Sequence, residues 1–497
     1  METPQNSIKI VEVSQISPSE NNETDQIKSL NLTFFDLLWI KFHPIERLFF
    51  YEFTGLSTTN FYSTILRRLK HSLSLALSHF RPLAGKLTSS VQYVDGKVVV
   101  GSFLDATYLI EDRLSYDDFS QVMCNYADIE REGVQLRLIY VCAIDNEERP
   151  ADFGGIQTGV SSCRGSVPPR CSNSGAGHHA ILDGKSSAMF IKSWAYLSKN
   201  FDQENLPSDL VPCFDRTVIK DQTGKLDMFY LDMWVNLAAK MNSKENPRSL
   251  KELDFGANKG DDLVRATFDF SREDIKKLRE KVQSNSIDHT NLYISSFTLT
   301  YAHAIICFVK AKGLESNEKV NFAFAADFRS RLVPPVPENY LGNYVGSKRV
   351  KTVEVKDIVR DELGLVIVAK NISDSIKELG KDGYLERIEE IFNSYSKLEP
   401  SLLGIIGVAG SPKLEIYGVD FGWGKPKKVD IVSIDKAGSF SMTESRDQIG
   451  GIEIGLVMKT QEELQAFASL FVQGLHCTNK LKQYYREYFD LIQKICG

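Results

Sequence analysis

The sequence lacks any Cys-x-x-Cys pair, although eight cysteines occur in its 497 residues. Cysteines this sparse and this scattered fit neither a disulfide-stabilised scaffold nor a zinc site. We therefore expect reduced thiols in a cytoplasmic protein that carries no metal.

An excess of positive charge is also missing. Lys and Arg total 59 against 65 Asp and Glu, which gives a net charge of -6, whereas nucleic-acid binding needs a basic surface. The most apolar early stretch, residues 32–42, is too short to span a bilayer and is interrupted by Asp36 and Lys41. The first residues lack the basic and then apolar order of a secretion signal. We expect no nucleic-acid partner, no membrane association and, because nothing in the sequence demands more, a monomer.

Internal repeats are missing too, and the chain is too long for one hydrophobic core. Helical and strand patterns mix without the strict alternation of a barrel, so we expect an α/β protein. A polar crossover at 201–226 suggests domains at 1–200 and 227–497. The predicted helices include 60–78, 228–241, 293–311 and 461–475, one that follows the His179 motif and one capped by Ser271, and residues 355–397 are expected to be mostly helical. The predicted strands include 48–53, a short one within 96–101, 263–270, 320–326, 414–418, 429–434, 439–443 and 451–458.

One stretch, residues 140–177, shows no strand or helix pattern. A catalytic histidine normally follows a rigid strand, and none is expected here. The Pro, Cys, Ser and Arg content of residues 143–177 resembles a frame-shifted or mis-spliced reading of a coding strand. If the stretch is genuine, we expect little activity.

His179 is followed four positions later by Asp183, and then by a glycine and an amphipathic run. An imidazole with its usual pKa of about 6.5 takes and returns a proton near neutral pH, so His179 is a candidate general base. Eight histidines supply roughly half a match to this spacing by chance. The alternative is a turn histidine beside Asp183 as a carboxylate at a helix start, where the dipole favours it.

A second motif, Asp420-Phe421-Gly422-Trp423-Gly424, is followed by a proline. Two glycines around a tryptophan allow a turn whose backbone packs closely against another surface. Alone, it is only a tight turn held by Trp423. Together with His179 and Asp183, in this order, it resembles the plant BAHD acyltransferases, which carry both motifs.

The resemblance extends over most of the chain, and it is strongest to one subgroup. Residues 408–412, 417–419 and 425–429 look most like the subgroup that malonylates phenolic, flavonoid and anthocyanin glucosides. That subgroup usually has a Tyr-Phe-Gly-Asn-Cys segment, whereas this chain has Tyr340-Leu341-Gly342-Asn343-Tyr344. The departure leaves the acceptor, and to some degree the donor, open.

The resemblance implies two similar domains of mixed β-sheet flanked by helices, as in chloramphenicol acetyltransferase, with the active-site channel between them. The first domain would carry the His-x-x-x-Asp motif and the second the Asp-Phe-Gly-Trp-Gly motif. It implies transfer of an acyl group, with malonyl favoured, from CoA to a hydroxyl such as the sugar 6-OH of a phenolic, flavonoid or anthocyanin glucoside. No cofactor besides the acyl-CoA co-substrate and no covalent acyl-enzyme is implied.

The resemblance also implies a role for each motif residue. His179 would take the proton from the acceptor hydroxyl and then protonate the departing CoA thiolate. Asp183 would be structural and would pair with a buried arginine, for which Arg329 is the candidate. The turn residues would shape the CoA side of the channel without reacting: Asp420, Gly422, Trp423 and Gly424.

Lys185 lies directly after the Asp-Gly pair, where malonyl-transferring relatives carry a basic residue. A cation there offers a malonyl carboxylate a charge-assisted partner that an acetyl group cannot use. We therefore predict that Lys185 binds the donor. The alternative is a solvated lysine in the first turn of a helix.

Three other functions stay open. The chain could be a BAHD acyltransferase that uses acetyl-CoA or hydroxycinnamoyl-CoA. It could be a catalytically silent, ligand-binding member, because of the aberrant stretch before His178. A metal enzyme using His178, His179 and Asp183 is disfavoured, since adjacent histidines rarely converge on one ion and no further ligand cluster is seen.

Overall fold

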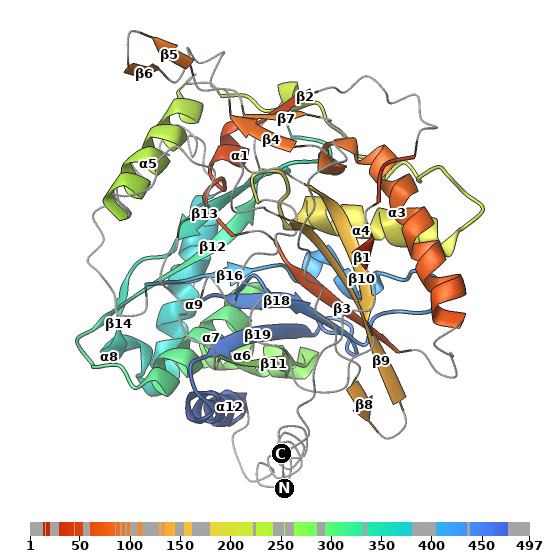
Figure 1. Ribbon diagram of the computed structural model, residues 1–497. Helices are drawn as coiled ribbons and strands as arrows, with labels where there is room; N and C mark the ends of the chain where they lie inside the picture. Colours follow the sequence, from red (N-terminus) through yellow and green to blue (C-terminus); the bar gives the residue numbers. More distant parts are fainter. Residues whose placement is uncertain are drawn as a thin grey trace, which may run out of the picture. The chain divides into compact units, whose positions relative to one another are not determined.

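Strands and helices mix along the chain in a computed structural model (Figure 1). For residues 13–14, and for the separate strands that lie between residues 86 and 161, the structure describes the backbone but not the side chains. The described residues are 13–14, 16–19, 29–43, 45–52, 60–84, 86–89, 92–94, 97–99, 108–111, 129–131, 134–144, 154–161, 179–221, 225–241, 253, 263–285, 294–331, 335–379, 404–434 and 438–475.

The chain divides into two units, each built from separate stretches of sequence. Unit 1 comprises Met1–Phe255, Asp327–Gly346 and Leu414–Ser433. Unit 2 comprises Gly256–Ala326, Ser347–Lys413 and Ile434–Gly497. A single division at 201–226 does not follow these units, because two stretches from the second half of the sequence belong to unit 1.

The largest sheet lies in unit 1 and is antiparallel throughout. Its order is β1-β10-β9-β3-β17, with β8 beside β9. Strand β17 pairs with β3 across most of the sequence, with Val429 opposite Phe49. The strands are β1 (Val13–Ser14), β3 (Arg47–Glu52), β8 (Ile129–Arg131), β9 (Val134–Ile144), β10 (Gly154–Ser161) and β17 (Lys428–Ile431).

The expectation that no strand lies within 140–177 is wrong. Strand β9 continues to Ile144, and β10 pairs with it antiparallel, with Thr158 opposite Val141. The physical reason is the apolar run of β9, which offers a backbone template, together with the alternation of Ile156, Thr158 and Val160. Residues 145–153 and 162–178 lie outside the described residues.

The other elements of unit 1 include a three-stranded antiparallel sheet, a two-stranded hairpin and several helices. The strands are β2 (Ser29–Asn31), β7 (Tyr108–Glu111), β4 (Lys86–Ser89), β5 (Gln92–Val94) and β6 (Lys97–Val99). The helices are α1 (Phe34–Leu37), the π-helical η1 (Phe61–Leu66), α3 (Arg67–His79), the 3-10 turn η2 (Arg81–Ala84), α4 (Gly184–Lys199), the 3-10 turn η3 (Arg216–Val218) and α5 (Leu226–Met241).

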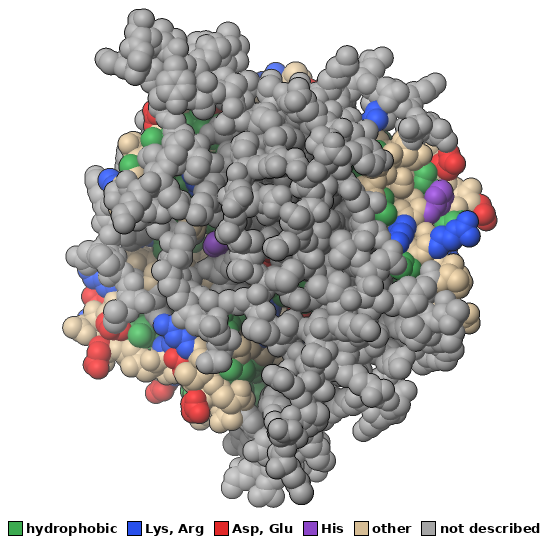
Figure 2. All heavy atoms as spheres, in the orientation of Figure 1, with side chains coloured by type: hydrophobic (Ala, Val, Ile, Leu, Met, Phe, Trp, Pro, Cys, Tyr) green, Lys and Arg blue, Asp and Glu red, His purple; other side chains and the backbone are tan. Residues whose placement is uncertain are grey.

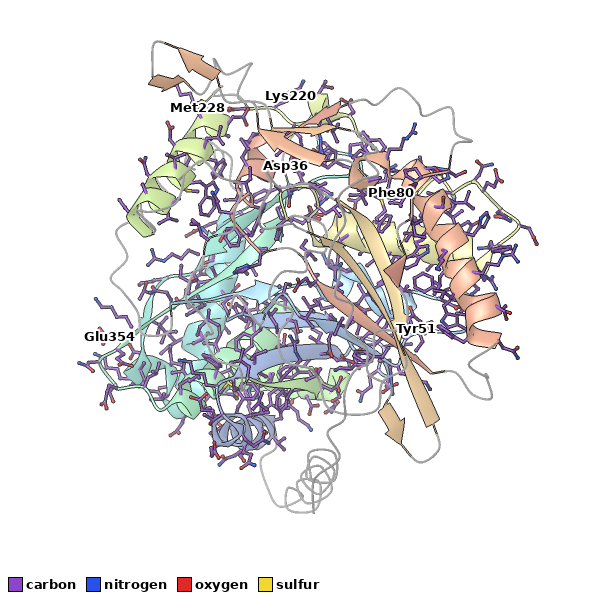
Figure 3. The ribbon with its side chains drawn as sticks, in the orientation of Figure 1. Asp36, Tyr51, Phe80, Lys220, Met228 and Glu354 are labelled. Atoms are coloured by element: carbon purple, nitrogen blue, oxygen red, sulfur yellow. The ribbon has the colours of Figure 1, made fainter. Side chains whose placement is uncertain are left out.

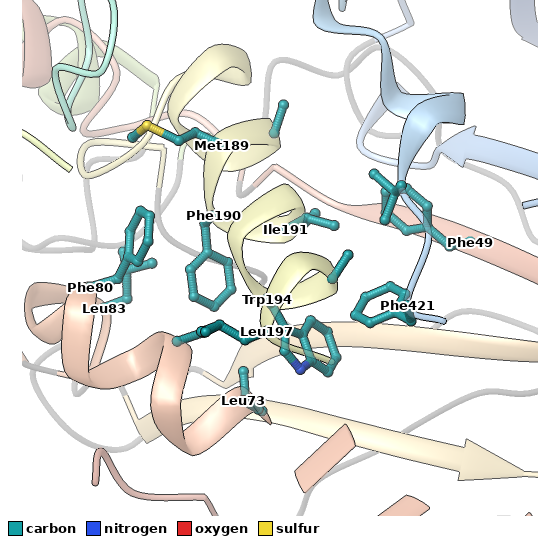
Figure 4. Close-up of a cluster of buried hydrophobic side chains, with 14 of the residues drawn as sticks. Phe49, Leu73, Phe80, Leu83, Met189, Phe190, Ile191, Trp194, Leu197 and Phe421 are labelled. Atoms are coloured by element: carbon teal, nitrogen blue, oxygen red, sulfur yellow. The ribbon is translucent and has the colours of Figure 1, made fainter. Parts of the chain in front are cut away.

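Helices α3 and α4 pack together over the hydrophobic core of unit 1 (Figure 4). Leu69, Leu73 and Leu77 recur at helical spacing on the buried face of α3, as the pattern in 60–78 predicts. From α4, the buried Trp194 donates its indole N–H to the carbonyl of Leu69 at 3.2 Å and meets Phe421 edge-on. Full burial of such large side chains contributes about 1.5–3 kcal/mol each, so this core holds α4 firmly in place.

Unit 2 contains a four-stranded sheet in the order β11-β19-β18-β16, and a further sheet has the order β13-β12-β14 with β15 beside β12. The strands are β11 (Val264–Phe270), β12 (Lys319–Asp327), β13 (Val345–Arg349), β14 (Val353–Glu354), β15 (Ile405–Ile406), β16 (Val408–Ala409), β18 (Phe440–Glu444) and β19 (Ile452–Met458). The helices are α6 (Arg272–Asn285), α7 (Ser296–Lys312), α8 (Val355–Ile358), α9 (Asp361–Glu378) and α12 (Gln461–Leu475).

Parallel and antiparallel pairs occur together in these sheets, since β16–β18 and β12–β15 are parallel. The expected α/β class with mixed sheets flanked by helices is therefore confirmed. The predicted strand at 414–418 is wrong: this stretch forms 3-10 turns, η4 (Pro412–Leu414) and η5 (Ile416–Gly418). Glu415 between them has a left-handed backbone (φ 49), which a strand cannot include.

Acidic and basic side chains of described residues lie interspersed on the face drawn in Figure 2. Within the described ranges, none of the helices combines the length and the apolar character that crossing a bilayer requires.

Candidate active site

His179 and Asp183 lie on the turn that enters α4, and all contacts of this site described below lie within unit 1. Asp183 is the N-cap of α4, with an extended backbone and a side-chain oxygen that accepts from Ser186 N at 2.8 Å. This satisfies one of the free N–H groups at the helix start. Asp183 is thus a helix-start carboxylate, and it has a second partner as well.

That second partner is Arg329. Its Nη1 donates to Asp183 Oδ2 at 2.8 Å, and both side chains are buried, with exposures of 1% and 0%. Burial raises the pKa of Asp183, but the Arg329 charge and hydrogen bonds from Arg329, Ser186 and Tyr344 outweigh it and hold the pKa below its usual range. The pair that the resemblance implies is therefore present, and the carboxylate stays charged.

Asp183, Arg329 and Ser186 together hold the loop that precedes β13. Arg329 Nη2 donates to the carbonyl of Gly342 at 3.2 Å, and Ser186 Oγ donates to the same carbonyl at 2.8 Å. The amide of Tyr344 donates to Asp183 Oδ2 at 3.1 Å. The backbone N–H makes this contact, so a tyrosine in place of the subgroup's cysteine keeps it.

Asn343 and, through it, Asp36 hold the backbone of His179, and motif reasoning identified neither of them. Asn343 donates its side-chain amide to the carbonyl of His179 at 2.7 Å and to Asp36 Oδ1 at 3.1 Å. Asp36 is buried (labelled in Figure 3), and its other oxygen accepts from Thr33 N and Oγ1. The spacing Thr33-x-x-Asp36 is that of a capping box, which was the available signal in the sequence.

The amide of Asn343 has a fixed orientation. Both partners of its Nδ2 are acceptors, so Oδ1 must be the other atom. In the part of the chain that the structure describes, Asn343 Oδ1 and His179 Nδ1 are both buried without a hydrogen-bond partner. One side chain therefore presents an unsatisfied acceptor, and its neighbour presents an unsatisfied ring nitrogen.

Burial lowers the pKa of His179 from 6.5 to about 4, against smaller effects of its own backbone, Asp183 and Asn343 that raise it. The charge of Arg47 lowers the pKa further. Arg47 is itself buried and donates to Ser187 Oγ at 2.7 Å. The imidazole is therefore neutral at pH 7, and it keeps part of its surface exposed.

Lys185, the predicted donor-binding residue, lies in the first turn of α4. Its ammonium contacts the carboxylate of Glu338, with side-chain exposures of 32% and 74%. An exposed pair of this kind is weak and salt-sensitive, so an anion can replace the carboxylate. Its donor-binding role stays a prediction.

The Trp423 turn lies at the other end of α4 from His179. Asp420 Oδ1 accepts from Gly422 N at 2.9 Å and Gly424 N at 2.8 Å, and its Oδ2 accepts from Lys199 at 2.7 Å. Both glycines have positive φ, 110 and 101, as the tight turn requires. Helix α4 has 16 residues and spans roughly 24 Å, so the two motifs are linked through this helix.

Metal binding finds no support in the described side chains. Among them, no three His, Cys, Asp or Glu residues are grouped to hold an ion. His178, the other ligand considered for a metal site, lies outside the described residues.

The sequence matches a known family model, described as "Transferase family", over residues 6–99 and 174–473. It is 36% identical over 485 residues to phenolic glucoside malonyltransferase 1 of Arabidopsis thaliana, covering 95% of this chain and 99% of that protein. It is also 36% identical over 484 residues to malonyl-CoA:anthocyanidin 5-O-glucoside-6''-O-malonyltransferase of Arabidopsis thaliana, covering 94% and 98%.

Among solved structures, the crystal structure of vinorine synthase resembles this chain with a TM-score of 0.56. The two are 19% identical, and the match covers 93% of this chain and 98% of that one. At this identity the likeness shows a common fold.

Proposed function

The chain belongs to the BAHD acyltransferases of the Transferase family, and from that premise we propose that it transfers malonyl from malonyl-CoA to a phenolic, flavonoid or anthocyanin glucoside. The accepting group is a sugar hydroxyl, the 6-OH. The names of the two relatives support this choice, since one acts on phenolic glucosides and the other is malonyl-CoA-dependent and acts on an anthocyanidin glucoside.

His179 is the general base of the proposed reaction. Nε2 removes the proton from the acceptor hydroxyl as that oxygen attacks the thioester carbonyl, and the imidazolium then protonates the departing CoA thiolate. The observation that carries this role is the position of His179 on the turn into α4, where Asn343 binds its backbone carbonyl at 2.7 Å and its side chain stays partly exposed. Burial lowers the pKa of the imidazole to about 4, so the ring is neutral and free to accept a proton. General base catalysis of this kind contributes about 10²- to 10⁴-fold. The acceptor attacks directly, so no acyl-enzyme forms.

Asn343 sets the tautomer of the base in this mechanism. A bond from His179 Nδ1–H to Asn343 Oδ1 satisfies two buried atoms that otherwise lack partners. It leaves Nε2 as the basic nitrogen. The Asp183–Arg329 pair holds the turn and does not react.

A different donor is the second candidate. The contact between Lys185 and Glu338 favours it, because a lysine engaged by a carboxylate is less available to a malonyl group. In that case the donor is acetyl-CoA or hydroxycinnamoyl-CoA, and the chemistry at His179 is the same.

A panel of malonyl-CoA, acetyl-CoA and coumaroyl-CoA, each tested against phenolic, flavonoid and anthocyanin glucosides, decides the substrates. We expect the highest kcat/KM with malonyl-CoA, and a loss of about 10²- to 10⁴-fold in His179→Ala. Unfolding curves must show that the variant folds. Unchanged activity of His179→Ala would contradict the mechanism. A higher kcat/KM with coumaroyl-CoA than with malonyl-CoA would show that the donor is a hydroxycinnamoyl-CoA. If the protein binds CoA but turns over no combination of acyl-CoA and glucoside, it is the catalytically silent, ligand-binding member.

A further inference from the structure

Trp39 stacks on the imidazole of His179. The two ring centroids lie 4.3 Å apart, and the ring planes differ by 9°. This near-parallel contact places the flat, apolar surface of the indole against one face of the imidazole. An imidazole alone can rotate about its side-chain bonds, whereas one held against an indole keeps its plane.

Trp39 is itself held in place. Its indole N–H donates to the carbonyl of Val345 at 3.1 Å, and its ring packs against that of Phe42, with 4.9 Å between the ring centroids. Phe42 in turn meets Trp234 of α5 edge-on at 5.7 Å. The indole of Trp39 is therefore held in one orientation.

Three consecutive residues, through one side chain and two backbone groups, contact Trp39, His179 and the start of α4. Asn343 binds the carbonyl of His179, the amide of Tyr344 binds Asp183, and the carbonyl of Val345 binds Trp39. Three consecutive residues thus set the relative positions of both ring systems. A stack anchored in this way is part of the site's geometry.

We propose that Trp39 is a positioning residue for His179, which fixes the plane of the imidazole and closes one of its faces to water. This inference rests on the proposed role of His179 as the base. With the plane fixed, Nδ1 stays beside Asn343 Oδ1 and Nε2 keeps one direction of approach for the acceptor. The ring also stays poorly hydrated, which keeps it neutral.

The alternative, that Trp39 is a stacking surface for an aromatic acceptor, fits the structure poorly. Its side chain is only 8% exposed. One face contacts His179, and Phe42 packs against the same indole. An acceptor ring would have to displace one of these side chains.

The test compares Trp39→Ala, Trp39→Leu and Trp39→Phe. Trp39→Ala and Trp39→Leu both remove the aromatic ring that stacks on the imidazole. In both variants kcat should fall about 10- to 100-fold, as expected for a misplaced base, with KM for both substrates nearly unchanged. Water then reaches the imidazole, so the acid limb of the pH–rate profile should move up from near pH 4 toward pH 6.5. Trp39→Phe keeps a flat face and should restore most of both properties.

Tyr301→Phe is the matched control. It removes a buried aromatic donor in α7 of unit 2, whose hydroxyl donates to the carbonyls of Ala323 at 2.9 Å and Ile406 at 3.0 Å, while the stack on His179 stays. Its acid limb should remain where it is in the unaltered protein. Trp39→Leu keeps an apolar side chain, so it reports on the stack even if Trp39→Ala fails to fold.

Two outcomes would overturn the proposal. One is a raised KM for the acceptor with kcat unchanged, which makes Trp39 an acceptor contact. The other is an acid limb that does not move in Trp39→Leu. NMR titration of ¹³C-labelled histidine, assigned with His179→Gln, measures the imidazole pKa without activity. If His179→Ala stays active, the proposed function fails, and this titration still shows whether Trp39 controls the ring.

Discussion

Arg329 and Asp183 form an ion pair of 2.8 Å between Nη1 and Oδ2, in which both side chains are buried. Both charges are removed from solvent, so Asp183 depends on Arg329 for compensation, whereas Arg329 also contacts Asp327 Oδ1 at 3.2 Å. The pair joins a residue just after β12 to the N-cap of α4, and Arg329 also holds the loop that carries Asn343.

Removing one partner should therefore destabilise the fold. Arg329→Met leaves the Asp183 carboxylate buried alone, and we expect a loss of about 3–5 kcal/mol in the free energy of unfolding, measured by urea denaturation. Lys276→Ala is the control, because Lys276 and Glu280 are 3.9 Å apart and both 63% exposed. That change should stay below about 0.5 kcal/mol after solvent screening. Similar losses of unfolding free energy in both variants would show that the buried pair stabilises the fold no more than an exposed pair does.

Asn343→Leu should impair catalysis more than folding. It removes the donor to the His179 carbonyl and to Asp36, together with the only acceptor we assign to His179 Nδ1. We expect kcat to fall about 10- to 100-fold, measured at substrate saturation. Asn200→Ala is the control: it loses one amide bond, to Tyr196 O at 2.9 Å, at the far end of α4. Full activity in Asn343→Leu would rule out a positioning role.

Lys185→Ala should lower kcat/KM for malonyl-CoA much more than for acetyl-CoA, because only malonyl carries a carboxylate for the ammonium. Glu338→Gln should act in the opposite direction: without the competing charge of Glu338, the ammonium of Lys185 binds the malonyl carboxylate more readily and KM for malonyl-CoA falls. Steady-state kinetics with both donors measure the two effects. Equal losses for both donors in Lys185→Ala would refute the donor-binding role.

Asp227, in the first turn of α5, should make stability depend on pH. Burial raises its pKa from 3.8 to about 6, and the charges of Asp221 and Asp36 add to this. The folded pKa lies above the unfolded one, so the stability that the protonated form contributes is complete below pH 3.8 and is lost as pH rises through 6. Asp227→Asn should therefore be more stable at pH 7 by about 1–3 kcal/mol, with the difference gone near pH 3.8. Urea denaturation at both pH values tests this, and a gain that is the same at both would contradict it.

Elements with a strong, uninterrupted pattern were predictable from sequence. The helix at 461–475 and the strand at 263–270 correspond to α12 (Gln461–Leu475) and β11 (Val264–Phe270). Strand β10 was missed because its glycines dilute an alternating pattern and its partner β9 supplies the pairing. The stretch 414–418 was misread because its alternation hides the left-handed backbone of Glu415.

In the candidate site, sequence reasoning named residues whose chemistry is local to a motif and missed those that act through distant contacts. His179 and Asp183 could be found from their spacing, and Arg329 from the resemblance. Asp36 and Asn343 are 307 positions apart, so no spacing rule joins them. Trp39 lies in the apolar stretch 32–42, and no pattern joins it to His179, because its stack on the imidazole exists only after folding.

The pairing of β17 with β3 has a consequence for biosynthesis. Strand β3 ends at Glu52, whereas β17 ends at Ile431 and Arg329 lies between them in the sequence. A ribosome has therefore made most of the polypeptide before the main sheet of unit 1 can close at that edge. The nascent chain leaves one edge of β3 unpaired until β17 emerges, and Asp183 lacks its cationic partner until Arg329 emerges. The site therefore matures late in translation, and chaperones have a long interval in which to bind it.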